Sequence, residues 1–161
     1  MPAVLRAATM RDAPEIVRVI RSSRIRFMPY ALPVHSEAED LRWVGNSLLA
    51  SGIVTVACVE GDVIGVSAVR NAEDAGWIDQ LYVEPDHCGR GIGSQLLASA
   101  LASLRRPVRL YTFQQNQRAR AFYELHGFRP VKFGDGSTNE ERCPDVLYEL
   151  GGGRDGREPR P

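Results

Sequence analysis

Hydrophobic residues near the N-terminus recur with the period of a helix. After a short β-like run at residues 3–7, the apolar positions fall three and four residues apart, at Ala13, Ile16, Val17 and Ile20. Thr9 and Asp12 precede them with the spacing of a capping box, which satisfies free amide groups at a helix start. The pattern predicts a first strand followed directly by a helix.

A second helix is expected after a loop. Residues 26–34 contain Pro29 and Pro33 and are interpreted as an ordered loop. Ser36 and Glu39 then repeat the capping-box spacing. The helix that follows carries a shorter apolar stripe, formed by Leu41, Val44 and Leu48.

Three β-rich runs come next. Residues 53–59 and 63–69 flank Glu60-Gly61-Asp62, which predicts a hairpin. A third run, at 77–83, ends at Pro85. Because side chains alternate along a strand, the period of two predicts one common face for Trp77, Asp79, Leu81 and Val83.

The second half of the chain alternates helices and strands. A helix is predicted over 91–104, a strand over 108–113, a helix from Asn116 to about residue 126, and closing strands at 128–133 and 146–150. The order β-α-α-β-β-β-α-β-α-β-β indicates an α+β fold in three layers. Its sheet is expected to be mixed, mostly antiparallel, and flanked by helices on both faces. Residues 1–150 are expected to form a single domain, and the Gly-rich tail 151–161 to be disordered.

Composition removes several classes of function. The chain has 161 residues, zero formal net charge and a pI of about 6.8, which gives no support for a nucleic-acid surface. Its cysteines, at 58, 88 and 143, form no CxxC pair, so no metal site is predicted. No signal peptide and no apolar run of membrane-spanning length is apparent. These features predict a cytoplasmic protein with reduced thiols.

The stretch from Leu81 to Ser94 carries the clearest chemical signal. A predicted strand runs into a turn with Gly89, Gly91 and Gly93, and the turn runs directly into a helix. Glycine lets the backbone adopt positive φ and approach a ligand, and the first amides of a helix attract anions. The turn is therefore predicted to hold a pyrophosphate. A glycine-rich helix start without a ligand is the alternative, and the spacing is neither that of a P-loop nor G-x-G-x-x-G.

At these residues the sequence resembles the GNAT superfamily of acyl-CoA-dependent N-acetyltransferases. The family's Gln/Arg-x-x-Gly-x-Gly/Ala motif falls on Cys88-Gly89-Arg90-Gly91-Ile92-Gly93. Its second cofactor motif is similar to Asn116, Ala121-Phe122-Tyr123 and Gly127-Phe128. Cys88 departs from the motif, because it replaces the usual Gln or Arg and removes a polar side chain beside the phosphates.

The resemblance implies a coenzyme site between splayed fourth and fifth strands, with acetyl-CoA as the co-substrate. Backbone groups of Leu81 and Val83 would bind the pantetheine and polarise the thioester carbonyl. The backbone from Gly89 to Ser94 would hold the pyrophosphate. The implied cofactor contacts are Leu81, Tyr82, Val83, Cys88, Gly89, Arg90, Gly91, Ile92, Gly93, Ser94, Asn116, Ala119, Phe122 and Tyr123.

Two residues are expected to carry the proton transfers. Tyr123 occupies the family's general-acid position and would protonate the leaving thiolate; its alternative is a core tyrosine beside Phe122. Asp79 is the candidate base, acting directly or through a water; its alternative is a strand carboxylate in a salt bridge.

The resemblance places the acceptor amine between the first two helices and the last hairpin. Candidate substrate residues there are Phe27, Tyr30, Asp79, Glu140 and Glu141. The carboxylates of Glu140 and Glu141 would attract a cationic amine. A solvated acidic loop and core aromatics are the alternatives. The sequence does not choose between a small-molecule and a peptide amine. It allows a homodimer but marks no interface.

Three hypotheses follow. The first is an N-acetyltransferase that transfers acetyl from acetyl-CoA to a primary amine by direct attack in a ternary complex. The second is a catalytically silent sensor that binds CoA or acyl-CoA. The third is a scaffold with a fortuitous glycine loop. Tyr123 favours the first over the second, and the presence of two motifs in register argues against the third.

Overall fold

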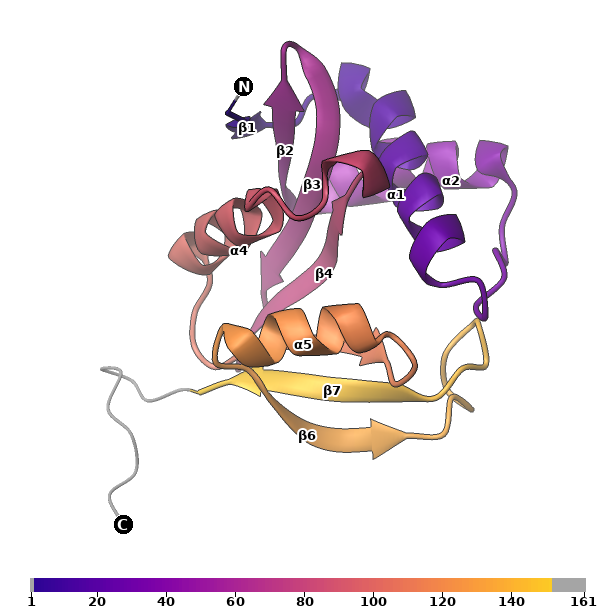
Figure 1. Ribbon diagram of the computed structural model, residues 1–161, viewed down its shortest axis with the longest axis vertical. Helices are drawn as coiled ribbons and strands as arrows, with labels where there is room; N and C mark the ends of the chain where they lie inside the picture. The colour runs from indigo at the N-terminus through magenta and orange to yellow at the C-terminus, as the bar shows by residue number, and fades with distance from the viewer. Residues whose placement is uncertain (1, 152–161) are drawn as a thin grey trace.

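A computed structural model describes residues 2–151 of the protein, which form one seven-stranded sheet flanked by helices (Figure 1). The strands are β1 (Val4–Ala7), β2 (Ile53–Val59), β3 (Asp62–Asn71), β4 (Gly76–Val83), β5 (Val108–Phe113), β6 (Arg129–Gly134) and β7 (Asp145–Leu150). The helices are α1 (Ala13–Phe27), α2 (Glu37–Trp43), α3 (Leu49–Ser51), α4 (Ile92–Ser103) and α5 (Gln117–Leu125). Three short helical turns complete the chain: η1 (Met10–Asp12), η2 (Val44–Leu48) and η3 (Pro85–His87).

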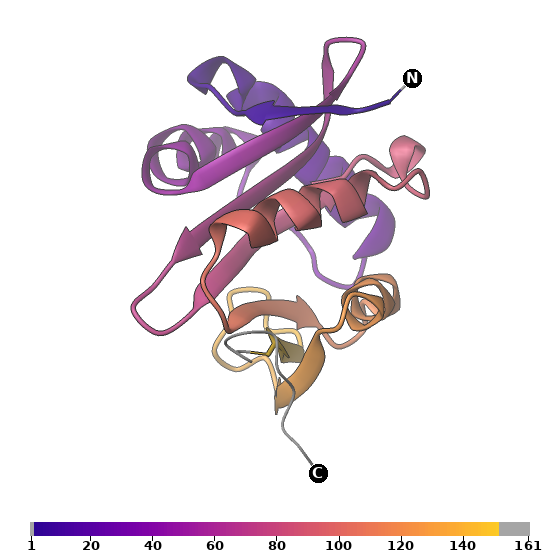
Figure 2. The same ribbon diagram turned by 90° about the vertical axis from the view of Figure 1, so that its left-hand side faces the viewer.

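The sheet has the order β1-β2-β3-β4-β5-β7-β6. Every neighbouring pair is antiparallel except β4 and β5, which run parallel. Viewed from the side, α1 and α2 lie behind the strands and α4 in front (Figure 2). The predicted fold class is therefore confirmed. The predicted tail 151–161 lies outside the described residues except for Gly151.

Two large groups of buried side chains hold the layers together. On one face, α1 and η2 pack on β2 and β3, and the predicted residues Ala13, Ile16 and Val17 are buried there. On the other face, α4 and α5 pack on β4, β5 and β7. The predicted second stripe is only partly buried, because Val44 and Leu48 lie in the first group while Leu41 stays exposed.

The parallel strands β4 and β5 separate after a short contact. Only two residue pairs join them, Gly76 with Val108 and Trp77 with Arg109. A side chain on Gly76 would meet the carbonyl oxygen of Arg105 at 2.6 Å, so glycine permits the close approach at this junction. Beyond this junction, β4 continues to Val83 and β5 to Phe113, but the two strands no longer pair with each other. The expected splay of β4 and β5 is therefore present.

A β-bulge at Asp79 corrects one prediction. Ala68 of β3 pairs with Gln80 and Val69 pairs with Ile78, so Asp79 has no partner on β3. Ile78 and Leu81 both pack into the buried group beneath α4. In a regular strand, residues three apart point to opposite faces, so the bulge is what brings these two side chains to the same face. Trp77 instead stacks on the exposed ring of Tyr111. The prediction of one face for residues 77, 79, 81 and 83 is therefore wrong, since a bulge shifts the alternation by one residue.

A buried carboxylate joins β1 to the start of α1. Asp12 is 5% exposed and accepts hydrogen bonds from Arg6 Nη1 and Nη2 at 2.8 and 2.9 Å and from the Thr9 amide at 2.7 Å. The Arg6 guanidinium lowers the pKa of Asp12 to about 2, although burial opposes this shift. The predicted capping box at Thr9 thus also anchors the edge strand.

Replacing this carboxylate should reduce stability in a pH-dependent way. The folded-state pKa of Asp12 lies below its unfolded value of 3.8, so its contribution is complete above pH 4 and is lost as the pH falls through about 2. We expect Asp12→Asn to lower the free energy of unfolding by about 1–2 kcal/mol at pH 7, and by clearly less at pH 3. Urea titrations at both pH values measure this, with the exposed Asp86→Asn as the control. An equal loss at both pH values would contradict the linkage.

Candidate active site

Three cavities lie against β4, and the central one is lined by both β4 and β5. The turn cavity, of about 350 Å³, lies at the glycine-rich turn; the central cavity, of about 590 Å³, lies between the two strands; the outer cavity, of about 520 Å³, lies against α1 and α2. The turn and central cavities share Met28, Leu81, Tyr82, Asn116, Ala119 and Tyr123. The central and outer cavities share Arg24, Gln80 and Glu141. The three cavities therefore adjoin one another in a series.

The backbone of the glycine-rich turn has the conformation that the sequence predicts. Gly89 and Gly91 have φ of +80° and +82°, and nothing lies within 4 Å of the position that a Cβ would take at either residue. Gly91 is the N-cap of α4, so the free amides of the first turn of α4 start at this cavity. Gly93 instead packs against the Phe122 ring, 3.5 Å from the position of a Cβ.

Most of the implied cofactor contacts line the turn cavity. These are Leu81, Tyr82, Val83, Cys88, Gly89, Gly91, Gly93, Ser94, Asn116, Ala119, Phe122 and Tyr123. Ile92 and Arg90 do not line it. Ile92 begins α4 and its side chain is buried between that helix and the sheet, whereas Arg90 is exposed. The Cys88 thiol faces the carbonyl oxygens of Val83 and Glu84, at 3.7 and 3.6 Å.

Four residues that line the turn cavity were not predicted from the sequence: Ser23, Met28, His87 and Arg118. His87 lines the cavity, and its buried Nδ1 has no hydrogen-bond partner among the described residues. Arg118 also lines it, with its guanidinium carbon 3.8 Å from the centre of the Phe27 ring. Phe27 thus lies in the turn cavity and not on the expected acceptor side. The only sequence signal was proximity to the two motifs, since His87 precedes Cys88 and Arg118 follows Asn116.

A hydrogen-bonded histidine ties the turn to α5. His126 Nδ1 lies 2.9 Å from the Phe122 carbonyl oxygen, which can only accept, so Nδ1 carries the proton. Nε2 is then free to accept from the Ser94 hydroxyl at 3.2 Å. This link holds the first turn of α4 against the end of α5.

Tyr123 stands where the turn and central cavities meet. It is 7% exposed and packs edge-on against Phe122 and Phe128. Its hydroxyl forms no hydrogen bond with another described residue. Burial, with a smaller contribution from Tyr82, raises the pKa of Tyr123 well above the usual range of a phenol. The side chain is therefore a neutral hydrogen-bond donor at every physiological pH.

Asn116 and Asp79 line the central cavity, each with a local partner. The Asn116 side-chain oxygen accepts the Ala119 amide at 3.1 Å and so caps α5, as predicted. Asp79 accepts a hydrogen bond from Arg70 Nε at 2.8 Å and keeps 34% of its side chain exposed. Asp79 therefore forms the salt bridge that the sequence analysis gave as the alternative to a base, and it also lines the central cavity.

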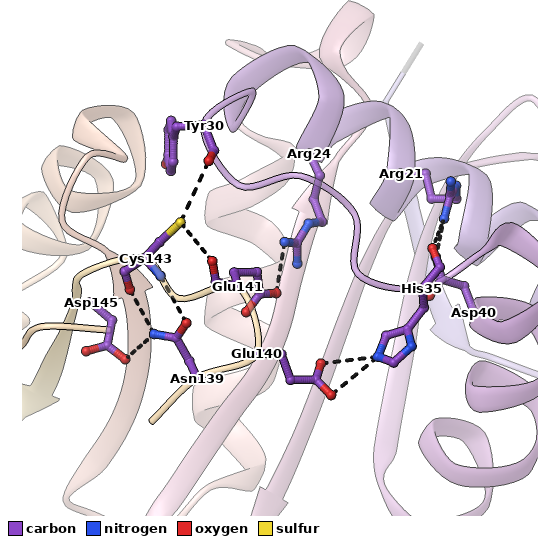
Figure 3. A network of polar contacts seen from close by, with 10 residues as sticks. All are labelled: Arg21, Arg24, Tyr30, His35, Asp40, Asn139, Glu140, Glu141, Cys143 and Asp145. Atoms are coloured by element: carbon purple, nitrogen blue, oxygen red, sulfur yellow. Dashed lines mark hydrogen bonds and ion pairs between the residues drawn. The ribbon is translucent and has the colours of Figure 1, made fainter. Parts of the chain in front are cut away.

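Contacts from α1 and the loop after it to the β6–β7 loop border the outer cavity (Figure 3). Arg24 of α1 forms an ion pair with Glu141 at 3.0 Å, and His35 lies 3.3 Å from Glu140. Glu141 is only 17% exposed, whereas Glu140 is exposed. Both glutamates line the outer cavity, as the acceptor-side prediction requires, and Glu141 also lines the central one.

Tyr30 has a different place from that expected. Its ring stacks edge-on against Phe113, and it does not line the central or the outer cavity. Its buried hydroxyl has no hydrogen-bond partner among the described residues, and burial raises its pKa to about 12. The Cys143 thiol donates to the Tyr30 carbonyl oxygen at 3.7 Å. This contact joins the α1–α2 loop to the β6–β7 loop.

Comparison with known proteins agrees with this geometry. A model of the acetyltransferase (GNAT) family matches residues 17–128. The chain belongs to the GNAT acetyltransferase family. It is therefore an acyltransferase, and the resemblance inferred from its two motifs is confirmed.

Known proteins resemble this GNAT protein in sequence or in fold. An uncharacterised N-acetyltransferase of Archaeoglobus fulgidus is 29% identical over 147 residues, which cover 83% of this chain and 98% of the relative. The uncharacterised N-acetyltransferase YafP of Escherichia coli is 27% identical over 107 residues, which cover 66% of this chain and 64% of its own length. The PaiA N-acetyltransferase of Thermoplasma acidophilum, solved in complex with coenzyme A, superposes with a TM-score of 0.75 at 20% identity, over 94% of this chain and 99% of its own.

Residues 2–151 contain no group of histidine, cysteine and acidic side chains arranged to bind a metal ion. No helix in the same range is long and apolar enough to cross a bilayer.

Proposed function

We propose that the protein is an N-acetyltransferase that transfers an acetyl group from acetyl-CoA to a primary amine by direct attack in a ternary complex. The observation that supports this most is the series of cavities, which runs from the glycine turn past Tyr123 to Asp79, where β4 and β5 have already separated. Such a path brings a bound thioester and an amine together from opposite sides.

The turn cavity has the donors that a diphosphate requires. Gly89 and Gly91 let the backbone approach, and the free amides of α4 lie at the positive end of its dipole. The unpartnered Nδ1 of His87 and the guanidinium of Arg118 add donors that Cys88 does not provide. These residues would hold coenzyme A, which when bound supplies the acetyl group as a thioester.

The reaction forms a C–N bond and breaks a C–S bond. Backbone amides of the Leu81–Val83 segment would stabilise the oxyanion, an effect worth about 3 kcal/mol per donor in comparable acyl transfer. The ammonium form of the acceptor loses two protons, one before the attack and one as the amide forms. One proton ends on the leaving sulfur and the other passes to solvent. The products are an amide and free coenzyme A.

Tyr123 would act on the leaving sulfur. A thiol with a pKa near 8.5 is more acidic than this phenol, so complete proton transfer from Tyr123 is uphill. We therefore assign Tyr123 a hydrogen bond to the developing thiolate, with the proton arriving finally from solvent or from the amine. Asp79 would take the amine proton, directly or through a water, because its carboxylate lines the central cavity.

Calorimetry with coenzyme A should test the glycine turn directly. We expect binding by the wild type, and a loss of at least about tenfold in affinity in Gly89→Val, because a branched side chain strains a positive φ and fills the cradle. Gly61→Val is a matched control, since Gly61 has φ +87° and open surroundings but lies in the β2–β3 hairpin. A wild type that does not bind at millimolar coenzyme A would refute the proposal.

Removing the Tyr123 hydroxyl should affect turnover more than binding. We expect Tyr123→Phe to lower kcat by about 10- to 100-fold, at the lower end of general-acid effects, with coenzyme affinity changed less than threefold. Tyr111→Phe, at an exposed ring of the same cavity, should retain activity. Thiol release followed at saturating substrates measures both, and an unchanged kcat would remove Tyr123 from the reaction.

The role of Asp79 should appear in the pH profile. Below the pKa of the amine, near 10, a base must deprotonate it, so Asp79→Asn should reduce turnover by about 100-fold at pH 7 and progressively less toward pH 10. Asp74→Asn is the control, because Asp74 pairs with Arg109 outside the lining of the cavities. Parallel pH–rate profiles of wild type and Asp79→Asn would exclude Asp79 as the base.

A further inference from the structure

The outer cavity has an apolar wall that its neighbours do not cover. Its apolar lining consists of Val17, Ile20, Ile25, Pro33, Val34, Trp43 and Val44. Three of these are large and exposed: Ile25 at 64%, Val34 at 51% and Trp43 at 41%. They come from α1, α2 and the loop between them, so the fold gathers them from separate segments around one space.

The charges around this wall are unequal. The central and outer cavities together are lined by six carboxylates, from Glu39, Asp40, Asp79, Glu140, Glu141 and Asp145. Against them stand three arginine or lysine side chains, Arg21, Arg24 and Lys132, with His35 beside Glu140. The chain as a whole has no net charge, so this acidic excess is local. It favours a cationic molecule.

The arginines of the outer cavity are already engaged. Arg21 forms an ion pair with Asp40, and Arg24 with Glu141. A carboxylate entering the outer cavity would therefore have to displace Asp40 or Glu141 to reach an arginine. Lys132 lines only the central cavity and is exposed, so solvent and salt screen its attraction for a carboxylate. This geometry disfavours amino acids as acceptors and favours amines that lack a carboxylate.

The cavity also has a limited size. Three contacts join α1 and the loop that follows it to the β6–β7 loop beside the cavity: Arg24–Glu141, His35–Glu140 and Tyr30–Cys143 (Figure 3). Its volume of about 520 Å³ lies within the range of small-molecule sites. Arg24, Gln80 and Glu141 then connect it to the central cavity, so a molecule with its body in the outer cavity can direct an amine toward Asp79 and Tyr123.

We infer that the acceptor is a small primary amine with an aromatic or branched alkyl body and no carboxylate. Its body packs against Trp43 and Val34 in the outer cavity, and its amino group passes the Arg24–Glu141 pair to reach the central cavity. This inference rests on the proposed acetyl transfer and specifies the substrate class for it.

Matched acceptors test the inference. With acetyl-CoA and thiol release as the readout, tryptamine should have a kcat/KM at least about 30-fold above tryptophan, and 3-methylbutylamine should exceed leucine similarly, because only the amino acids carry an unpaired carboxylate. Both amines should also exceed spermidine, which lacks an apolar body. Preference for an amino acid, for spermidine or for a peptide N-terminus would overturn the inference and leave acetyl transfer standing.

Two variants of α2 test where the apolar body of the acceptor binds. Trp43→Ala should lower kcat/KM for tryptamine at least tenfold, mainly through KM, and change it less than twofold for ethylamine, which does not reach Trp43. Leu41→Ala is the matched control, since Leu41 is equally exposed on α2 but does not line the cavity. Equal effects on the two amines would show that the outer cavity does not hold the acceptor.

Calorimetry on the protein loaded with coenzyme A separates the two proposals. We expect tryptamine to bind and tryptophan to bind at least tenfold more weakly. Binding of tryptamine without thiol release from any amine would refute the acetyl transfer but support the assigned ligand class. Absence of tryptamine binding together with turnover of another amine would refute only the inference.

Discussion

The site depends on the loss of backbone pairing between β4 and β5. Two residue pairs at Gly76 and Trp77 hold the strands together, and beyond them each strand presents unpaired backbone groups to the gap. Buried peptide groups without partners are costly, so a gap of this kind is stable only where a ligand or water can satisfy them. The neighbouring layers keep it open, because α4 and α5 pack on one side and α1 on the other. In the proposed reaction, the same gap would admit the thioester and supply hydrogen-bonding groups along its wall.

Electrostatics divides this passage into two ends. At the turn cavity, free amides of α4, His87 and Arg118 favour an anion. At the outer cavity, carboxylates outnumber the cations, and the arginines present are held in ion pairs. Tyr123 lies between the two ends, uncharged because burial raises its pKa. A negatively charged coenzyme and a positively charged amine would thus enter from opposite sides without competing for the same groups.

Much of the fold and part of the site could be predicted from local pattern. The capping boxes at Thr9 and Ser36, the hairpin at residue 61 and the glycine turn depend on residues within a few positions of one another. The bulge at Asp79 could not be predicted, because it arises from the register of β3 against β4 and leaves no mark in the alternation of β4 itself. Phe27 and Tyr30 were expected beside the acceptor, but the sequence could not show which way the end of α1 and the turn after it direct these two side chains.

The sequence by itself determined the element order, the mixed sheet, the glycine turn and the membership of the GNAT family, since these are set by periodicity and by short motifs in register. Only the tertiary structure decided which side chains share a cavity. Arg118 reaches the turn, Arg24 meets Glu141 across 117 positions of the chain, and Trp43 faces the same space as Glu140. Such contacts depend on how helices pack on a twisted sheet, and that packing is fixed by the sum of many buried surfaces rather than by any local pattern of residues.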